Sequence, residues 1–553
     1  MSKSNKKKNT TKPVEERYTL PNSMANLFLL AAFTLFPLFV NLTLVPGFPF
    51  ISFENGFRAI RHYKYYLFLV LACLFVIIEI MLLVTKSAEE IKEPNPKRRT
   101  LTKSLRFTDW AMLALVLSSA VSTLFSPYFD AAFFGEATVG SYTVGRNNGL
   151  LLILAYAAVY LALTRCFRYK EYVFTAMAVV SGVIYLLAVL NGFYIDPLRM
   201  FVQFEDNPTI YQNFMTTIGN KNMFSSYICV TLPVIICLFV QAGELWRKAV
   251  YLAVTAVGAM AVVVCDSDSV VLGLGAFAAV FTVAYAKTPR RLKRLLLSFT
   301  VMLLSVKLLR LFALWGGDRY KELTALPSRL MFSNAAFIAL GVLAVLTAAL
   351  YALDWRKPGF RMPKAVPFVL GGVFAAAALA GLGTLVYFSA IDTQSDLGDA
   401  ARLLRYGDAW GTHRGFMWNK ALEAFGGFNV FQKLFGTGPE TFYYTFSPYF
   451  SELWSRFGDT STDAAHNEYI NYLLNLGIVG LASYLTLAGG ALVRAFKAAK
   501  RNPLSLVFAS AVVAYLAQAV VNIALPIATP LFVIFLSLCE ATARRAEKER
   551  EAP

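Results

Sequence analysis

The chain has 553 residues, of which 57% are hydrophobic and only 16% are charged, and its mean hydropathy is +0.54. This composition excludes a soluble enzyme with a single membrane anchor and indicates an all-α polytopic membrane protein. The formal net charge of +18 does not point to nucleic acid as a partner, because the basic residues are dispersed among short loops. In such loops Lys and Arg set the orientation of a protein in the lipid bilayer. Some of these cations remain for a phosphate-bearing ligand.

Apolar runs long enough to cross a bilayer predict about fourteen transmembrane helices. A basic tail, residues 1–22, precedes them, and a charged tail, residues 542–553, follows them. About eleven of the predicted helices lie in residues 23–390, and the others lie in residues 476–541, where the last two could form a hairpin. The predicted limits are 25–46, 65–85, 108–125, 149–165, 172–191, 222–241, 247–264, 269–286, 294–315, 331–353, 366–390, 476–496, 504–521 and 525–541.

Lys and Arg are concentrated in every second predicted loop, counted from the N-terminal tail, and the short loops between are poorer in both. These rich loops include 86–106, 165–170, 247–248, 289–294, 356–364 and 494–501. Because Lys and Arg collect on the cytosolic side of the cell membrane, both termini are predicted to be cytosolic. The loop at residues 391–475 is then extracytoplasmic.

The loop at residues 391–475 is about 80 residues long, and a connection of that length is uncommon unless it has a function of its own. It contains His413 and His466, and the chain has only 3 histidines. We therefore expect the catalytic chemistry in this loop. No cysteine lies in it, and no cysteine spacing in the chain suggests a metal site.

Three arginines of the loop, Arg402, Arg405 and Arg414, are candidate ligands of a phosphate group. A guanidinium presents a planar fork of donors that suits phosphate, and surroundings that are poor in water strengthen the interaction. The alternative is that these arginines bind lipid headgroups or pair with the nearby aspartates of the loop.

Two short motifs of the loop suggest defined backbone positions. The glycines of Gly436-Thr437-Gly438 allow positive φ or close backbone approach, and a structural turn is the default interpretation of such a run. Asp463 is placed to cap a helix that starts directly after it, and Gly477 is placed to stop that helix. His466 would then lie in the first turn, where the helix dipole favours a neutral ring able to accept a proton. A packing histidine at the membrane interface is the alternative.

The run Gly436-Thr437-Gly438, followed by Ala465-His466-Asn467-Glu468-Tyr469, resembles the signature of the O-antigen ligase and polysaccharide polymerase superfamily. Upstream, Gly219-Asn220-Lys221-Asn222 is similar to that family's Gly-Asn-x-Asn motif before a central span, and Arg414 matches its arginine position. The resemblance is specific in the polar loop, and the O-antigen ligase-like region is expected to cover about residues 250–490.

This resemblance implies an all-helical, GT-C-like membrane glycosyltransferase that needs no metal or other cofactor. Such enzymes transfer or polymerise a polyprenyl-diphosphate-linked glycan onto a hydroxyl of a glycan, lipid or protein acceptor outside the cytoplasmic membrane, in cell-surface polysaccharide biosynthesis. The resemblance assigns His466 as the base that deprotonates the acceptor, and Arg414 as a ligand of the donor diphosphate, which agrees with the chemistry of a diphosphate leaving group. The supporting motif positions are Asn467, Gly436, Gly438, Asn220 and Asn222.

The chain departs from the family at Asp268, which stands where many members carry an arginine that also serves the diphosphate. A carboxylate cannot bind a diphosphate directly, so either another cation takes that role or the donor lies differently. Asp266 or Asp268 could instead orient an acceptor sugar or pair with a cation. Lys307 and Arg310 share one face of an apolar helix, although their side chains could also extend to the outer surface. The candidate cations are Arg402, Arg405, Lys307, Arg310 and Arg146.

The alternative function from another class is a multispan transporter, for example a flippase for lipid-linked oligosaccharides. Many spans and intramembrane cations would suit it, but the large outer loop and the lack of a detectable repeat of two halves favour the enzyme. The sequence does not separate a polymerase from a ligase, since that choice depends on which acceptor fits the site. It also leaves the oligomeric state open.

Overall fold

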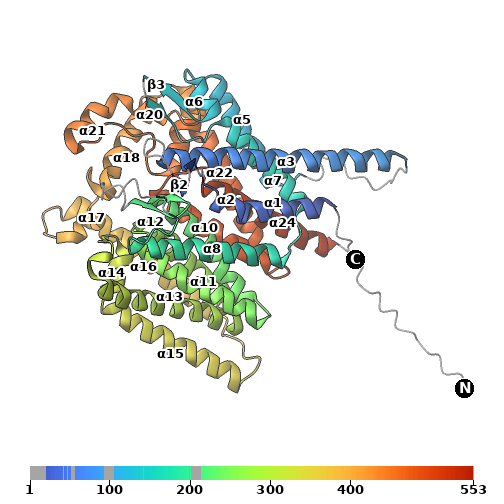
Figure 1. The fold of residues 1–553 in the computed structure, drawn as a ribbon, viewed down its shortest axis with the longest axis vertical. Helices are drawn as coiled ribbons and strands as arrows, with labels where there is room; N and C mark the ends of the chain where they lie inside the picture. Colours follow the sequence, from blue (N-terminus) through green and yellow to red (C-terminus); the bar gives the residue numbers. More distant parts are fainter. Residues whose placement is uncertain are drawn as a thin grey trace, which may run out of the picture.

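The protein is a bundle of long helices with a smaller helical unit at one end (Figure 1). The computed structural model describes residues 20–40, 43–45, 48–50, 56–92, 105–140, 142–198, 200 and 213–551. Within these ranges the only sheets are three two-stranded hairpins, so the predicted all-α class is confirmed. Most of the predicted N-terminal tail lies outside the described residues.

The elements follow one another in an almost purely helical order. The long helices and the short α2 are α1 (Leu20–Phe33), α2 (Leu35–Leu38), α3 (Gly56–Lys92), α5 (Phe107–Leu124), α7 (Leu150–Cys166), α8 (Glu171–Gly192), α10 (Lys221–Gln241), α11 (Leu245–Val264), α12 (Asp268–Tyr285), α13 (Pro289–Gly316), α15 (Ala335–Arg356), α16 (Val366–Val386), α22 (Glu468–Ala498), α23 (Leu504–Gln518) and α24 (Thr529–Glu551). The other short helices are α6 (Phe129–Phe134), η2 (Gly317–Arg319), α14 (Leu326–Phe332), η3 (Tyr387–Ile391), η4 (Gly398–Ala400), α17 (Ala401–Leu404), α18 (Trp410–Gly426), α19 (Val430–Phe435), α20 (Phe442–Phe446), η5 (Ser447–Tyr449), α21 (Phe450–Phe457) and η6 (Ala519–Val521). The antiparallel strand pairs are β1 (Thr43–Val45) with β2 (Phe48–Phe50), β3 (Ala137–Val139) with β4 (Tyr142–Val144), and β5 (Phe214–Met215) with β6 (Gly219–Asn220).

Among the described residues, 12 helices are long and apolar enough to cross a membrane. Every predicted apolar run contains a helix, although the first run, 25–46, is helical only as far as Leu38. The prediction of about fourteen spans exceeds the 12 candidates because two helices fall short. The first, α7, is apolar but has only 17 residues. The second, α24, is charged along its C-terminal half, which includes Glu540 and Arg544.

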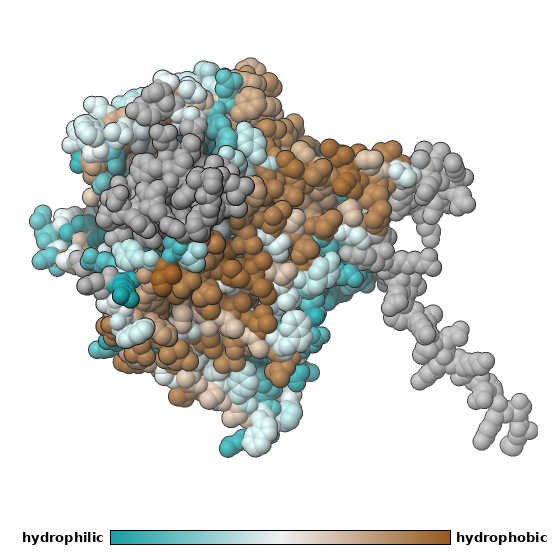
Figure 2. Space-filling view, in the orientation of Figure 1, coloured by the Kyte–Doolittle hydropathy of each residue, from teal (hydrophilic) through white to brown (hydrophobic). Residues whose placement is uncertain are grey.

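The helix α10 forms the centre of the bundle. Its apolar segment is 100% buried inside the protein, and it packs against α11, α12 and α23. At the periphery, the apolar segment of α16 has 0% of its residues buried. Figure 2 shows a broad apolar band across the helices between more polar ends, as expected for a surface in contact with lipid.

The chain between α16 and α22 is a folded unit, not a simple connection. Helices α17, α18, α20 and α21 gather at one end of the long helices, on the left of Figure 1. The buried apolar residues of this unit are Phe416, Met417, Ala421, Phe442, Phe446, Leu453, Ala465 and Leu474. These helices lie within the predicted loop, residues 391–475. Its last part and the following span form the single helix α22, kinked at Gly477.

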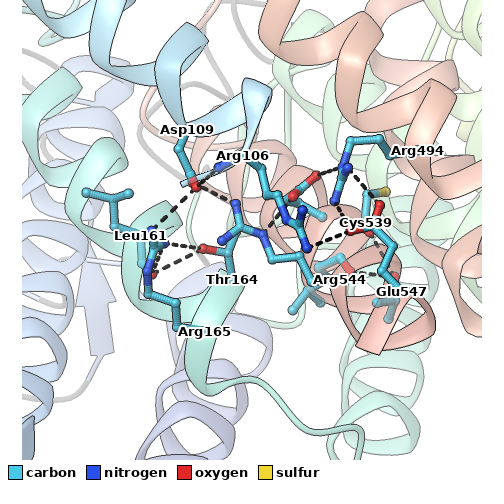
Figure 3. A network of polar contacts seen from close by, with 12 residues as sticks. Arg106, Asp109, Leu161, Thr164, Arg165, Arg494, Cys539, Arg544 and Glu547 are labelled. Carbon is cyan, nitrogen blue, oxygen red and sulfur yellow. Dashed lines mark hydrogen bonds and ion pairs between the residues drawn. The ribbon is translucent and has the colours of Figure 1, made fainter. Parts of the chain in front are cut away.

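At the opposite end of α22, buried charges join α5, α7, α22 and α24 (Figure 3). Arg494 donates from Nε to Glu540 Oε2 (2.8 Å), and Arg544 donates from Nε to Glu540 Oε1 (2.7 Å). Arg544 also pairs through Nη2 with Asp109 Oδ1 (2.7 Å). The structure gathers at this end four arginines from segments that were predicted to face the cytosol: Arg106, Arg165, Arg494 and Arg544.

Glu540→Ala is expected to lower the free energy of unfolding by about 3–5 kcal/mol, because it leaves two buried arginines without their shared carboxylate. Chemical denaturation of the purified protein in detergent measures this loss. The control is Glu549→Ala on the same helix, where the side chain is 55% exposed and its loss should cost less than about 1 kcal/mol. Equal losses in the two variants would contradict a buried network.

Candidate functional site

The Gly436–Gly438 turn packs against the kink in α22. The amides of Thr437 and Gly438 donate to two carbonyls at the end of the first segment of α22, at 3.1 and 3.0 Å. A Cβ on Gly436 would come within 3.0 Å of the backbone of α22, and one on Gly477 would come equally close to the backbone of α19. Both glycines have positive φ. The turn therefore has a structural role, because only glycine permits this contact between two backbones.

His466 lies immediately before α22, on a segment that is held on both sides. Asn467 caps the helix, since its Oδ1 accepts from two N–H groups of the first turn at 3.0 and 3.1 Å. On the other side, the carbonyl of Ala465 accepts from Trp418 Nε1 of α18 at 2.9 Å. His466 itself has φ 50°. Such a conformation is costly for a non-glycine residue and persists where the surrounding contacts fix it.

The predicted start of this helix is wrong. The helix begins at Glu468 and its N-cap is Asn467, because the Asp463 carboxylate is bound to an arginine instead. His466 is therefore not in the first turn, and the helix dipole does not account for its charge. Gly477 (φ 67°) interrupts the helix at the predicted position, but the helix continues beyond it.

The environment of His466 keeps its imidazole neutral. Burial, together with Arg146 and Arg414, lowers the pKa of His466 to about 3, and Asp463 acts in the opposite direction. The Nδ1 atom is buried and has no hydrogen-bond partner among the described residues. The structure thus brings together three of the predicted site residues, which come from distant parts of the sequence.

Arg146 joins two segments around His466. Its guanidinium donates from Nε to Asp463 Oδ1 (2.6 Å), and its Nη2 contacts the same oxygen. Its backbone N–H donates to Glu440 Oε2 (2.6 Å). Burial by itself raises the pKa of Asp463, but Arg146 outweighs burial and holds that pKa below its usual range. One of the cations beside His466 therefore has a carboxylate partner already.

Glu440 directly follows the glycine turn and Pro439, and it has φ 57°. Burial, reinforced by Asp463, raises the pKa of Glu440 from 4.5 to about 7, although the Arg146 N–H and the Asn148 side chain oppose the shift. This carboxyl therefore holds its proton more tightly than an exposed glutamate does.

A cavity adjoins the ion pair and is lined by Arg146, Glu440 and Glu468, among others. Glu468 is fixed in it by two phenols, since its carboxylate accepts from Tyr484 (2.8 Å) and Tyr515 (3.0 Å). The cavity thus connects the outer charged cluster with polar groups inside the bundle.

Arg414 is the first regular residue of α18 after a left-handed run. The run Gly411–His413 has φ values of 62°, 62° and 65°. Arg414 Nη1 donates to the Gly411 carbonyl (2.8 Å), and its Nε is buried without a hydrogen-bond partner among the described residues. Burial lowers the pKa of Arg414, and Asp268 opposes this shift. Arg414 therefore retains donors that a ligand could use.

Three of the other candidate cations are used elsewhere in the fold. Lys307 Nζ donates to three carbonyls at the end of α14, at 2.6–3.1 Å. Arg405 donates to three carbonyls of the loop at 2.7–3.4 Å. The Arg310 guanidinium lies over the rings of Phe332 and Phe337, at 5.9 and 5.8 Å. The structure does not bring these cations to the histidine.

Asp266 and Asp268, where the sequence differs from the family pattern, bind backbone N–H groups at the start of α14. Asp268 Oδ1 accepts from the Leu326 N–H (2.8 Å), and Oδ2 pairs with Arg402 Nη2 (3.4 Å). Asp266 Oδ1 accepts from two N–H groups before α14 at 2.9 and 2.7 Å, and Oδ2 pairs with Lys221 (3.3 Å). These carboxylates are thus engaged by the backbone and by cations.

The asparagines of the upstream motif fix the start of α10. Asn220 is the N-cap, and its Oδ1 accepts from the Asn222 N–H (2.9 Å). Asn222 Oδ1 accepts from Ser267 (3.0 Å), and its carbonyl accepts from Asn522 (2.8 Å). The motif therefore ties α10 to α12 and to the chain after α23.

Sequence reasoning did not select Glu440, Asp463 or Arg61 as residues of the site. Glu440 could have been found from its place after Gly438-Pro439, and Asp463 from its place three residues before His466. Arg61 gives no signal, because it comes from the start of another helix. Among the described residues, no group of three His, Cys, Asp or Glu side chains could hold a metal ion, and independence from metal stays a prediction.

Residues 329–485 match the family model described as O-antigen ligase (Wzy_C). The match runs from α14 into α22 and includes Arg414 and His466. No curated protein matches the chain. The match confirms the resemblance inferred from the motifs, over a shorter range than the predicted residues 250–490, and it supports a general role in glycan ligation or polymerisation at a membrane.

Gly436→Ala and Gly477→Ala are each expected to destabilise the loop unit by about 1–3 kcal/mol, because the new Cβ would meet a neighbouring backbone at positive φ. Limited proteolysis between α16 and α22 and chemical denaturation measure the change. The matched control is Gly489→Ala in the same helix, where a Cβ would meet nothing within 4 Å. A similar loss in all three variants would contradict the specific contact.

Glu440→Gln is expected to gain stability relative to the unsubstituted protein as the pH rises from 4.5 to about 7. The folded state holds the Glu440 proton more tightly than the unfolded state, so stability from this group is complete below 4.5 and is lost as the pH passes about 7. The opposite contribution of His466 is present in both proteins and cancels in the difference. Unfolding midpoints of both proteins across this range test the prediction, and a difference independent of pH would refute it.

Proposed function

Because the chain carries an O-antigen ligase domain at residues 329–485, we propose that it is a glycosyltransferase of the cytoplasmic membrane. It transfers or polymerises a polyprenyl-diphosphate-linked glycan onto a hydroxyl of a glycan, lipid or protein acceptor, in cell-surface polysaccharide biosynthesis. The loop unit then faces the outside, and both termini lie in the cytosol. The observation that carries the proposal is the neutral imidazole of His466 close to Arg146 and Arg414.

In this proposal His466 is the general base. Its buried Nδ1 has no hydrogen-bond partner among the described residues, so it can receive the proton of the acceptor hydroxyl. The hydroxyl oxygen forms a bond to the anomeric carbon of the donor, and the bond from that carbon to the diphosphate oxygen breaks. The electron pair leaves with the diphosphate, and Arg414 stabilises the charge that develops there.

A bound donor would also strengthen the base. The pKa of about 3 makes His466 a weak base in the unliganded site, because burial, Arg146 and Arg414 all disfavour the imidazolium. A diphosphate beside the same arginines adds negative charge, and a nearby anion raises the pKa of an imidazole. Deprotonation of the acceptor is then favoured only after the donor has bound.

A flippase for lipid-linked oligosaccharides is the alternative function. It would use the membrane helices and the cations, but it has no need for a base. His466 is neutral, and its Nδ1 and the Nε of Arg414 have no hydrogen-bond partner among the described residues. This arrangement favours a catalytic role over transport. In reconstituted vesicles, translocation without formation of a glycosidic bond would favour the flippase.

His466→Ala is expected to be produced normally but to lose about 10²–10⁴-fold in transfer rate, because the acceptor is no longer deprotonated. Surface polymer should then be absent while lipid-linked units accumulate, as measured by glycan electrophoresis and lipid extraction. The control is His413→Ala in the same loop, since His413 pairs with Asp459 (3.0 Å) and stacks on Phe457, and it should retain most of the activity. Normal polymer from His466→Ala would end the enzymatic proposal.

A further inference from the structure

Arg61 near the start of α3 is a buried guanidinium that has no hydrogen-bond or ion-pair partner among the described residues. Its side chain is only 5% exposed, and its Nε is buried without a hydrogen bond. No hydrogen bond or ion pair links it to any residue in the part of the chain that the structure describes. The carboxylates of Asp463, Glu440 and Glu136 interact electrostatically with this charge, but none of them forms a hydrogen bond or ion pair with the guanidinium in the described part of the chain, so buried donors are left without an acceptor there.

Two other buried cations among the described residues, Lys64 and Arg544, are each held by several partners. Lys64, which follows Arg61 by one turn of α3, donates from Nζ to three carbonyls at the end of α2 at 2.8–2.9 Å. Arg544 in the distant network is bound to Glu540 and Asp109. Arg61 therefore differs from these cations in leaving its donors unused.

The start of α3 lies against the segment that carries Arg146. His62, next to Arg61, has its Nδ1 3.8 Å from Glu136 Oε2. A Cβ on Gly145 would lie 3.0 Å from the Glu136 Cα, and Gly145 directly precedes Arg146. The contacts of α3 thus place Arg61 beside the loop that holds the ion pair.

Charge interactions place Arg61 at the same cluster independently. Arg61 interacts electrostatically with Asp463, Arg146 and Glu440. The first two are also the charged neighbours of His466. Arg61 therefore approaches this cluster from α3, while Arg414 approaches the histidine from α18.

We propose that Arg61 is an anion-binding residue of the donor site and that it binds the diphosphate beside the Arg146–Asp463 pair. This inference rests on the proposed function for the identity of the anion. A guanidinium offers a planar fork of donors that matches the oxygens of a phosphate group. Arg61 thereby supplies the cation that is missing at Asp268, and Arg146, already bound to Asp463, holds the cluster in position.

The test uses the full-length protein in lipid nanodiscs and inorganic pyrophosphate as the probe, titrated by calorimetry at constant ionic strength. Arg61→Gln is expected to weaken pyrophosphate binding about 10-fold or more, the usual effect of losing hydrogen bonds to a charged group. Arg61→Lys should bind with intermediate affinity, because it keeps the charge but lacks the fork. The control is Arg456→Gln, which removes the same charge from an exposed pair with Asp408 and should leave the affinity unchanged.

A second readout separates ligand binding from a structural role. Without pyrophosphate, Arg61→Gln should unfold at a denaturant concentration close to that of the unsubstituted protein, because no hydrogen bond or ion pair among the described residues is lost. Lower resistance to unfolding together with unchanged pyrophosphate affinity would overturn the inference. If Arg61→Gln does not fold, Arg61→Lys decides, and an affinity equal to that of the unsubstituted protein would overturn it.

Failure of this inference can be distinguished from failure of the proposed function. If Arg61→Gln binds pyrophosphate normally while His466→Ala abolishes transfer, the role of Arg61 is wrong and the glycosyltransferase stands. If pyrophosphate binding depends on Arg61 but the protein forms no glycosidic bond from a lipid-linked donor, the anion site stands and the glycosyltransferase is wrong.

Discussion

The ion pair between Arg146 and Asp463 is the interaction on which the site depends. It joins positions 317 residues apart in the sequence and removes Asp463 from the role of helix cap. It places a cation beside His466 and, through the Arg146 backbone, holds the Glu440 carboxyl. Because the pair is buried, loss of either partner would leave an uncompensated charge. This one contact thus fixes the shape of the cluster, and it adds to burial, the main cause of the neutral imidazole.

Polar contacts at the two ends of α22 set its position in the bundle. Lipid is as apolar as the helix surfaces, so burial of apolar side chains gives little preference for one arrangement of membrane helices over another. At one end, Gly436 and Gly477 allow two backbones to touch. At the other end, Arg494 and Arg544 share the Glu540 carboxylate. The long helix therefore carries His466 on a support that is fixed at both ends.

Most of the fold could be predicted from apolar runs, because a lipid bilayer leaves helices as the main way to satisfy backbone hydrogen bonds. Every predicted run contains a helix. The predicted number of spans is too high because α7 is short and α24 is charged. Glu540 and Arg544 of α24 are tolerated because they form ion pairs inside the protein. Hydropathy does not reveal such pairing, since it treats each residue alone.

The sequence by itself determined the membrane class, the helical runs and the motif around His466 that led to the family. Only the tertiary structure decided which cations belong to the site. Lys307 and Arg405 are used by backbone carbonyls, whereas Arg146 lies beside His466 in the connection between β4 and α7, and Arg61 lies near the start of α3. The physical reason is that a span or a turn depends on neighbours along the chain. The charge and the partner of an ionisable side chain depend on which other segments pack beside it.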